Sequence, residues 1–242
     1  MTPLSAAQQI DFFRAIPWCA AHLASPSLVI NESVSHRSKR RDLDRLISRT
    51  LNRPDGIPAY IIFYDAPSPS SPTPPSSAAS TPSPLSAPLD SSRSTSAQNN
   101  QPTAANEQPR PFINQVSALV ALGPGLNGWE GICHGGMVVT LLDEVMGQLL
   151  AANRSEGLLP ADVPSMTAYL NTRFERPVRT DTALSSSGGQ QKNDSATTVV
   201  LVEARLRRHE GRKYWLEADV RGSEGEVLAR AEALFVMLKA KL

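Results

Sequence analysis

The chain has 242 residues, a formal net charge of +1 and 40% hydrophobic residues. This length fits one large domain or two small ones, and the near-neutral charge excludes the strong basic field typical of nucleic-acid binders. No run of about 18 apolar residues is present to span a membrane. The N-terminus lacks a secretory pattern, and two cysteines, Cys19 and Cys133, give no disulfide framework. We therefore expect a cytoplasmic protein with no nucleic-acid or membrane partner.

The N-terminal region predicts helices. Residues 5–16 have a helical pattern, with Ser5 and Gln8 spaced as a capping box and Pro17 marking the end of the helix. We interpret residues 1–66 as a helical extension that packs on the domain that follows.

Two further segments and a low-complexity stretch complete the first half. Residues 38–51 place three leucines and an isoleucine at helical spacing, and residues 59–64 form a short apolar run typical of a strand. Residues 67–109 hold 10 of the 20 prolines and 12 serines, and such a composition buries too little apolar surface to offset its ordering entropy. We predict that residues 67–111 are a disordered insertion and that the strand at 59–64 joins the edge of the sheet beyond it.

The second half has the pattern of one strand, one long helix and a meander of strands. Residues 115–122 are typical of a strand, and a strongly apolar helix is expected from 135 to about 153. Four segments of period two follow, separated by turn or loop residues: 165–175, 197–208, 213–221 and 226–238. A polar loop is expected at 185–194. The pattern predicts an α+β domain over residues 112–242, in which an antiparallel sheet wraps around the helix.

The most informative segment is the start of this helix, His134-Gly135-Gly136, with Asp143 nine positions after the histidine. The first N–H groups of a helix have no partner inside the helix and carry the positive end of its dipole. Glycines there let another molecule approach the backbone closely. Such a helix start suits an anion, or a carbonyl oxygen that becomes one during a reaction.

Asp143 lies about two turns into the helix, on roughly the same face as its start. Its helical neighbours include Val139 and Met146, and Gly147 leaves room beside it. A carboxylate on an apolar, buried helix needs a reason, because burial of a charge is costly unless the charge is compensated. We take Asp143 as the reactive acid and the adjacent Glu144, on a more polar face, as a bystander. The alternative is a structural ion pair between Asp143 and an arginine of a neighbouring element.

These residues resemble the signature of the hotdog-fold acyl thioesterases, in the phenylacetate-type branch, where His-Gly-Gly and Asp are separated by six residues. The resemblance extends to residues 167–178 and to the last two strand segments, 210–218 and 227–236. It covers roughly residues 113–239. The insertion and the N-terminal helices are similar to those of fungal relatives. The expected fold is therefore a hotdog domain with an N-terminal helical extension.

The resemblance implies roles for the residues around the helix start. Asp143 would be the catalytic carboxylate, acting as a general base on water or as a nucleophile on the thioester. His134 would orient the glycine loop and the thioester, although it is also typical of a hydrogen-bonded turn residue. The backbone N–H of Gly136 would hold the oxyanion, and Gly135 would contact the substrate.

Further substrate contacts are expected from neighbouring segments. Related enzymes often carry Asn or Gln six residues before the histidine; here that position is Gly128, and Asn127 is the nearest amide. Thr167 aligns with a polar strand residue that faces the catalytic carboxylate of the partner subunit in this family. Arg173 and Arg176 near the end of the first meander strand would bind coenzyme A phosphates or form a solvated strand end.

Other chemistries have little support. No metal-ligand spacing, Walker loop or dinucleotide fingerprint is present, so we expect neither a metal nor a cofactor. Cys133, beside His134, is interpreted as a buried apolar residue and not as a nucleophile.

The sequence therefore predicts an acyl thioesterase that hydrolyses an acyl-CoA, or an acyl group on a carrier protein, to a free acid and a thiol in a secondary-metabolite pathway. The resemblance implies a homodimer or dimer of dimers with sites shared between subunits. Two alternatives stay open. One is a hotdog dehydratase or lyase on an acyl thioester, and the other is a non-catalytic acyl-binding protein.

Overall fold

The computed structural model describes residues 4–31, 45–66, 112–180 and 198–239. Three predictions lie outside the described residues in whole or in part: the insertion at 67–111, the first half of the helix at 38–51 and the loop at 185–194.

The first half of the chain forms two helices, two strands and a short helical segment. These are α1 (Ala6–Arg14), α2 (Pro17–His22), β1 (Leu28–Asn31), the π-helix η3 (Leu46–Thr50) and β2 (Tyr60–Asp65). The second half begins with β3 (Gln115–Leu122), the 3₁₀ segment η4 (Pro124–Leu126), β4 (Asn127–Trp129) and β5 (Ile132–Cys133). It continues with α3 (Gly135–Ser155), β6 (Ser165–Phe174), β7 (Thr198–Glu210), β8 (Lys213–Arg221) and β9 (Val227–Met237).

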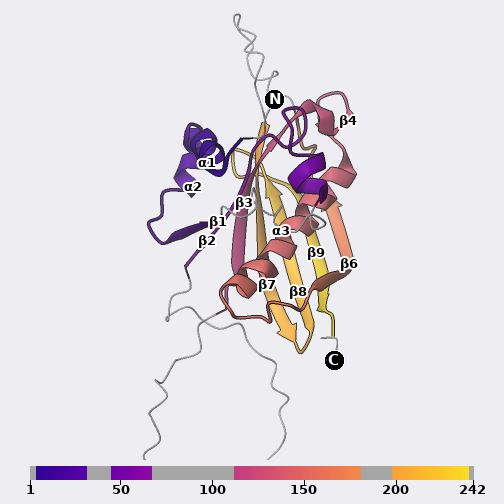
Figure 1. The fold of residues 1–242 in the computed structure, drawn as a ribbon. Helices are drawn as coiled ribbons and strands as arrows, with labels where there is room; N and C mark the ends of the chain where they lie inside the picture. Colours follow the sequence, from indigo (N-terminus) through magenta and orange to yellow (C-terminus); the bar gives the residue numbers. More distant parts are fainter. Residues whose placement is uncertain (1–3, 32–44, 67–111, 181–197, 240–242) are drawn as a thin grey trace, which may run out of the picture.

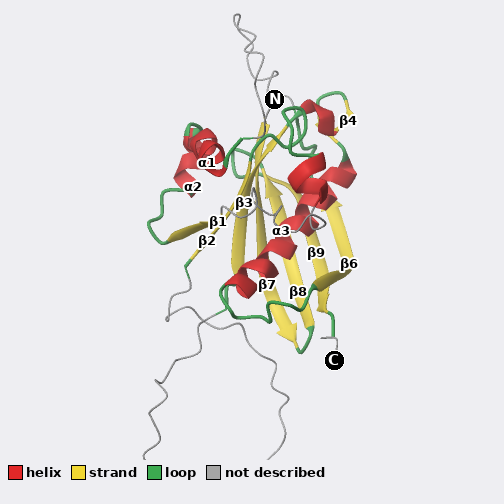
Figure 2. Cartoon of the chain, in the orientation of Figure 1, coloured by secondary structure: helices red, strands yellow, loops and turns green. Residues whose placement is uncertain are grey.

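Seven strands form one antiparallel sheet in the order β1-β2-β3-β7-β8-β9-β6, and β4 pairs with β5 separately. The sheet curves around α3, as Figure 1 and Figure 2 show, and this confirms the predicted α+β hotdog fold. The long helix and all five strands predicted after residue 112 are present. The outermost strands of the sheet are β1 on one side and β6 on the other.

The N-terminal region is only partly the helical extension that the sequence predicts. The capping box of Ser5 and Gln8 is present at the start of α1. The first helix ends at Arg14, before Pro17, as predicted. Pro17 begins a second helix, α2, that the sequence did not predict, and proline is favoured at the first position of a helix. Both β1 and β2 belong to the sheet, and β2 lies between β1 and β3 and not at the edge. The boundary expected at residue 112 therefore does not separate the sheet from an extension, and residues 67–111 interrupt one domain.

Both faces of the β2–β3 part of the sheet are covered by apolar side chains. On the inner face, Ile62 and Val120 pack in the core that contains α3. On the outer face, Ile61 and Leu119 pack with Phe13 of α1. Because successive side chains of a strand alternate between faces, cover on both sides explains why the run from 59 to 64 is apolar at every position. Each such side chain contributes about 1.5–3 kcal/mol on full burial.

Two buried amide side chains fix the helices to the sheet region. Gln9 of α1 accepts a 2.8 Å hydrogen bond from the backbone N–H of Tyr60. Asn153, near the end of α3, accepts from the N–H of Ile113 at 2.8 Å and donates to its carbonyl oxygen at 3.0 Å. A buried polar group left without a partner costs about 1–3 kcal/mol, so these paired contacts specify where each helix docks.

The apolar composition of α3 follows from its central place. Among the described residues it is the one helix long and apolar enough to cross a membrane by length and composition, with a mean hydropathy of 1.3. Half of that apolar stretch is buried inside the molecule. Packing in the core therefore accounts for its composition.

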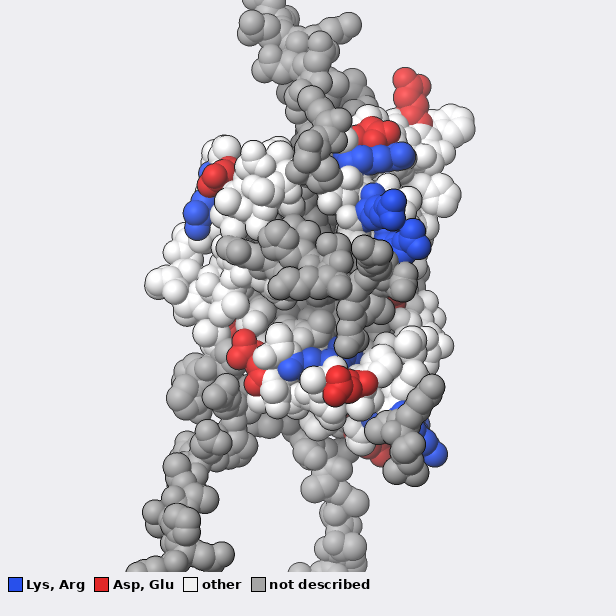
Figure 3. All heavy atoms as spheres, in the orientation of Figure 1, with Lys and Arg blue, Asp and Glu red and all other residues white. Residues whose placement is uncertain are grey.

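Charged side chains of both signs occur on the described surface. On the face drawn in Figure 3, acidic and basic side chains form small groups and no extended basic stripe. Nucleic-acid binders gather basic side chains into such a stripe or patch.

Candidate active site

The start of α3 leaves one backbone amide free. His134 is the N-cap, and its Nδ1 accepts a hydrogen bond from the N–H of Gly136 at 3.0 Å. The amides of Met137 and Val138 donate to the carbonyl oxygen of His134 at 2.8 and 3.2 Å. Within the described part of the chain, the N–H of Gly135 has no hydrogen-bond partner, and the residue is exposed. A free donor therefore stands at the positive end of the helix dipole.

This hydrogen-bond pattern changes the roles expected of the two glycines. The sequence assigns the oxyanion-holding amide to Gly136, but that amide is already bonded to the imidazole of His134. Gly135 is the residue whose N–H can meet a negative oxygen without breaking a hydrogen bond. The same contact leaves Nδ1 of His134 unprotonated, so a neutral ring carries its proton on Nε2. His134 caps the helix through this contact, and its role in orienting the thioester stays a prediction.

Close packing of β4 against His134 explains the missing amide side chain. A Cβ on Gly128 would lie 2.9 Å from both Cα and Cδ2 of His134, so only glycine lets the imidazole lie there. The neighbouring Asn127 is exposed, and its Oδ1 accepts a hydrogen bond from the hydroxyl of Thr180. Asn127 is thus tied to the segment after β6, and its contact with substrate stays a prediction.

An aromatic residue that the sequence did not single out lies beside the free amide. A Cβ on Gly135 would be 3.4 Å from Cζ of Phe174, the last residue of β6. The side chain of Phe174 lies on the same face of β6 as Leu170 and Thr172, which is the face toward α3. It is nevertheless 53% exposed. The exposed Trp129 on β4 adds to the apolar surface in this region, with 76% of its surface accessible. In this single chain, the helix start is therefore bordered by uncovered apolar surface.

Asp143 lies in the middle of α3 and is half-buried, not fully buried as the sequence predicts. Its Oδ1 accepts a 2.7 Å hydrogen bond from the hydroxyl of Thr167 in the same chain, whereas the resemblance implies that Thr167 faces a partner subunit. An added Cβ on Gly147 would meet nothing within 4 Å, which confirms the room predicted beside the carboxylate. No arginine pairs with Asp143 among the described residues, so the alternative of a structural ion pair finds no partner there.

Two nearby groups take no part in this arrangement. Glu144 accepts a 2.6 Å hydrogen bond from the side chain of Gln148, as expected for a bystander on the more polar face. Cys133 is buried, and burial raises the pKa of its thiol to about 11, so the reactive thiolate is scarce near neutral pH. Among the described residues, no group of three or more His, Cys, Asp and Glu side chains could hold a metal ion.

Gly135 and Asp143 of one chain lie too far apart to act together on one carbonyl group. They are eight residues apart on a continuous helix, or about 12 Å along its axis at ~1.5 Å per residue. A reacting carbonyl needs an oxyanion donor and a base each within about 3 Å. The helix of one chain therefore does not bring these two groups to the same carbonyl group.

The two predicted phosphate-binding arginines lie on different parts of the surface. Arg173 is paired in register with Arg230 of β9, on the outer face of the sheet, away from α3. Arg176 follows β6 and is exposed, with its backbone N–H donating to the carbonyl oxygen of Leu228 at 3.0 Å. The structure brings Thr167 to Asp143 and His134 to the glycines, but it places Arg173 on the opposite face from both.

Comparison with known proteins shows what the chain is similar to. Residues 130–214 match the model of the thioesterase superfamily. Verlamelin biosynthesis protein B of Lecanicillium sp. is 25% identical over 231 residues, which cover 86% of this chain and 84% of the relative. The acyl-coenzyme A thioesterase THEM4 of Bos taurus is 30% identical over 117 residues, covering 48% of this chain and 38% of the relative. This chain thus spans well under half of THEM4.

Solved structures of thioesterases are also similar to the second half of the chain. One thioesterase superfamily protein has 30% identity and a TM-score of 0.38, covering 50% of this chain and 48% of its own. A phenylacetic acid degradation-related protein of Ralstonia eutropha JMP134 has 20% identity and a TM-score of 0.40, covering 51% of this chain and 76% of its own.

Proposed function

We propose that the protein is an acyl thioesterase that hydrolyses an acyl-CoA to a free acid and coenzyme A. The observation that carries this proposal is the pair of groups on α3, an unpartnered amide at Gly135 and a carboxylate at Asp143 oriented by Thr167. Thioester hydrolysis needs a donor for the oxygen that becomes negative and a base for the attacking water. The match of residues 130–214 to the thioesterase superfamily model supports the same chemistry.

In the proposed reaction, Asp143 takes a proton from water while the water oxygen bonds to the thioester carbonyl carbon. The carbonyl oxygen becomes negative and accepts a hydrogen bond from Gly135 at the helix start. Collapse of this intermediate breaks the C–S bond, and the thiolate leaves with the proton that Asp143 holds. In a second route, the carboxylate itself attacks, and water then cleaves the mixed anhydride. A single turnover in ¹⁸O-water distinguishes the routes, because cleavage at the Asp143 carbon leaves the product acid unlabelled.

We infer that two chains complete each site, in a homodimer or a dimer of dimers. The separation of about 12 Å along α3 supports a site whose donor and base come from different chains. The strand β6 is an edge of the sheet, and it exposes Met166, Tyr169 and Phe174 by 50%, 42% and 53%. Exposed apolar edge strands favour pairing with another chain. A second copy paired along β6 would cover these side chains and bring its own carboxylate toward Gly135.

The identity of the thiol and the pathway rest on the relatives. The name of THEM4, an acyl-coenzyme A thioesterase, supports coenzyme A as the thiol that is released. The name of the Lecanicillium relative, a verlamelin biosynthesis protein, supports a role in secondary metabolism. An acyl group on a carrier protein is the alternative substrate, because both carriers present the same phosphopantetheine thioester.

The remaining alternatives differ in their products. A dehydratase or lyase on the same fold would need a nitrogen base aimed at the acyl chain. Nδ1 of His134 already accepts a hydrogen bond from the backbone N–H of Gly136. A non-catalytic acyl-binding protein would not need the oriented carboxylate at Asp143. Both features favour hydrolysis.

The direct test is a panel of acyl-CoA esters and acyl-carrier proteins, with released thiol and products followed by a thiol dye and mass spectrometry. The proposal predicts free acid and thiol in equal amounts, with coenzyme A esters turned over faster than carrier-bound ones. An enoyl thioester without thiol release would indicate a lyase. Tight binding without any product would indicate an acyl-binding protein.

A further inference from the structure

The outer face of the sheet, turned away from α3, has two different halves. Over β2 and β3 it is covered by apolar side chains of α1 and α2. Over β7, β8, β9 and β6 it is charged. Along β9, Ala229, Ala231 and Ala233 are buried in the core that contains α3, whereas Arg230 and Glu232 alternate to the outer face. Their partners in register on β8 and β6 share this outward orientation.

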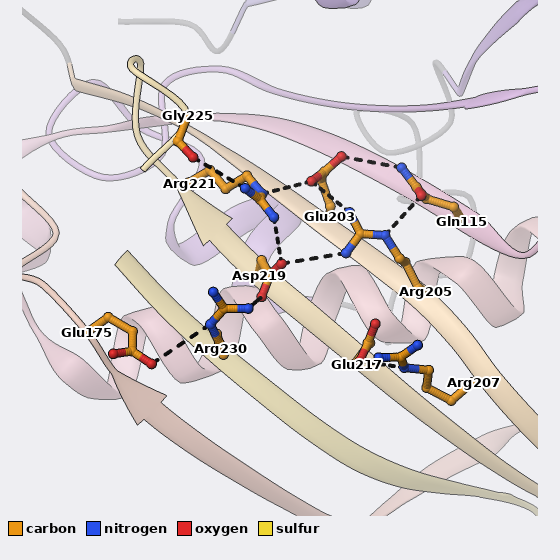
Figure 4. Close-up of polar contacts among 10 residues, drawn as sticks. All are labelled: Gln115, Glu175, Glu203, Arg205, Arg207, Glu217, Asp219, Arg221, Gly225 and Arg230. Atoms are coloured by element: carbon orange, nitrogen blue, oxygen red, sulfur yellow. Dashed lines mark hydrogen bonds and ion pairs between the residues drawn. The ribbon is translucent and has the colours of Figure 1, made fainter. Parts of the chain in front are cut away.

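Most charges on this outer face are satisfied by one another, as Figure 4 shows. The carboxylate of Asp219, whose side chain is 11% exposed, is shared by three guanidinium groups: Arg221 at 2.9 Å, Arg205 at 3.5 Å and Arg230 at 3.5 Å. Arg207 forms a close pair with Glu217 at 2.6 Å. These arginines have carboxylate partners within the sheet.

Arg173 and Arg230 form the exception. They lie directly opposite each other in the β6–β9 register, where Cβ atoms approach to about 5 Å and like charges repel. Within the described residues, the side chain of Arg173 has no ion pair or hydrogen bond. Arg230 has two long contacts, 3.5 Å to Asp219 and 3.8 Å to Glu175. Two neighbouring guanidinium groups therefore keep donors that no carboxylate uses at close range.

The two arginines line one groove of about 520 Å³. It is lined by residues from β6, β7, β8 and β9, among them four arginines and three carboxylates: Arg173, Arg205, Arg207, Arg230, Glu217, Asp219 and Glu232. A volume of several hundred Å³ is that of a small-molecule site. The arginine side chains without close carboxylate partners are Arg173 and Arg230. The carboxylate of Glu232, two residues further along β9, accepts a 3.3 Å hydrogen bond from Asn171.

We propose that this groove binds a phosphate-bearing small molecule, with the phosphate between Arg173 and Arg230. Arginine forks match phosphate oxygens, and a phosphate has enough acceptors and charge to serve two guanidinium groups at once. It would also relieve their mutual repulsion. The carboxylate of Glu232 would accept a hydrogen bond from a hydroxyl or amine group elsewhere on the ligand. The phosphate has two possible sources, coenzyme A itself or a separate phosphorylated metabolite, and the site does not depend on the proposed thioesterase activity.

The test is calorimetric titration of the full-length protein with inorganic pyrophosphate at low ionic strength. Each arginine would contribute charge-assisted hydrogen bonds, so Arg173→Gln and Arg230→Gln should each weaken binding about 10-fold or more. Without pyrophosphate, Arg173→Gln should melt at the same or a higher temperature than the wild type, because a repulsion is removed. With pyrophosphate, the wild type should gain more thermal stability than Arg173→Gln does.

A matched control uses the closed pair in the same groove. The double variant Arg207→Gln/Glu217→Gln leaves the net charge of the groove unchanged, so pyrophosphate affinity should stay within about 3-fold of the wild type. Displacement of pyrophosphate by coenzyme A would identify coenzyme A as the source of the phosphate. Lack of displacement would indicate a separate phosphorylated metabolite. Absence of pyrophosphate binding, or an equal loss in all three variants, would overturn the proposal.

Discussion

The start and the middle of α3 carry different kinds of functional group. At the start, the group is the backbone amide of Gly135, which is exposed and has no hydrogen-bond partner among the described residues, whereas the neighbouring N–H of Gly136 donates to His134. In the middle, the group is the side chain of Asp143, half-buried and held by Thr167 of β6. Access to the amide at the helix start depends on a small residue at position 135. The carboxylate in the middle of the helix depends on its charge and on the hydrogen bond from Thr167.

This difference separates the effects of substitutions. At the helix start, changes that keep the N–H should be tolerated, and changes that remove it should stop the reaction without harming the fold. In the middle of the helix, loss of the carboxylate should be severe, and loss of its partner should be milder. If conservative side-chain changes at Gly135 lowered the rate as much as loss of the Asp143 carboxylate, the division into a backbone group and a side-chain group would be wrong.

The largest effect is expected for Asp143→Asn. The amide cannot accept a proton from water, so the rate should fall by about 10² to 10⁴-fold. Its oxygen can still accept the hydrogen bond from Thr167, so the circular dichroism spectrum and melting temperature should be retained. Steady-state thiol release measures the loss. A variant with a kcat near that of the wild type would remove Asp143 from the mechanism.

Gly135→Pro tests the backbone amide itself. Proline removes the N–H at the first helical position, where proline is favoured and where the donor has no partner among the residues that the structure describes. Loss of one oxyanion donor should lower kcat by about 10²-fold. Gly135→Ala keeps the N–H and places its Cβ 3.4 Å from Phe174, so it should retain most of the activity. Equal kcat values for the two variants would show that another group holds the oxyanion.

A smaller effect is expected for Thr167→Val, which removes the donor to Asp143. The carboxylate keeps its charge but loses its orientation, so kcat should fall about 10-fold with KM little changed. Thr172→Val is the matched control on the same strand and face. The hydroxyl of Thr172 is buried without a hydrogen-bond partner in the described structure, so its loss should leave activity unchanged and stability the same or higher. Similar kinetics for both valine variants would contradict a positioning role for Thr167.

The smallest effect is expected for Cys133→Ala. Burial holds this thiol in its protonated form near neutral pH, so the variant should retain kcat within about 2-fold, and thiol-alkylating reagents should not inactivate the wild type quickly. A large fall in kcat with an unchanged melting temperature would instead indicate a reactive cysteine beside His134.

The fold was readable from the sequence where periodicity was strong. The apolar helix at 135–155 and the alternating strands after it match the structure because burial on one face or one stripe sets the pattern directly. The place of β2 inside the sheet was not predicted, because an apolar run cannot say which elements cover its two faces. The cover by α1 on the outer face is a tertiary contact.

For the candidate site, the sequence indicated residue types but not the directions in which their groups point. The free amide at Gly135 depends on the rotation of the His134 ring, which spacing does not reveal. A bulge between Thr167 and Tyr169 reverses the alternation of β6, so Arg173, which strict period two places on the face of Thr167, points outward. The same bulge turns Phe174 toward the helix start. This bulge therefore places Arg173, a predicted phosphate contact, on the face of the sheet opposite the predicted catalytic residues.

Subunit complementation tests most directly whether the amide of one chain works with the carboxylate of another. Asp143→Asn and Gly135→Pro chains, each inactive alone, are mixed in equal amounts and allowed to exchange. About half of the dimers should be mixed, and each mixed dimer has one site with an intact Gly135 and an intact Asp143 from opposite chains. Activity should therefore return to about a quarter of the wild-type value per chain. No recovery, with mixed dimers confirmed by native mass spectrometry, would contradict the shared site.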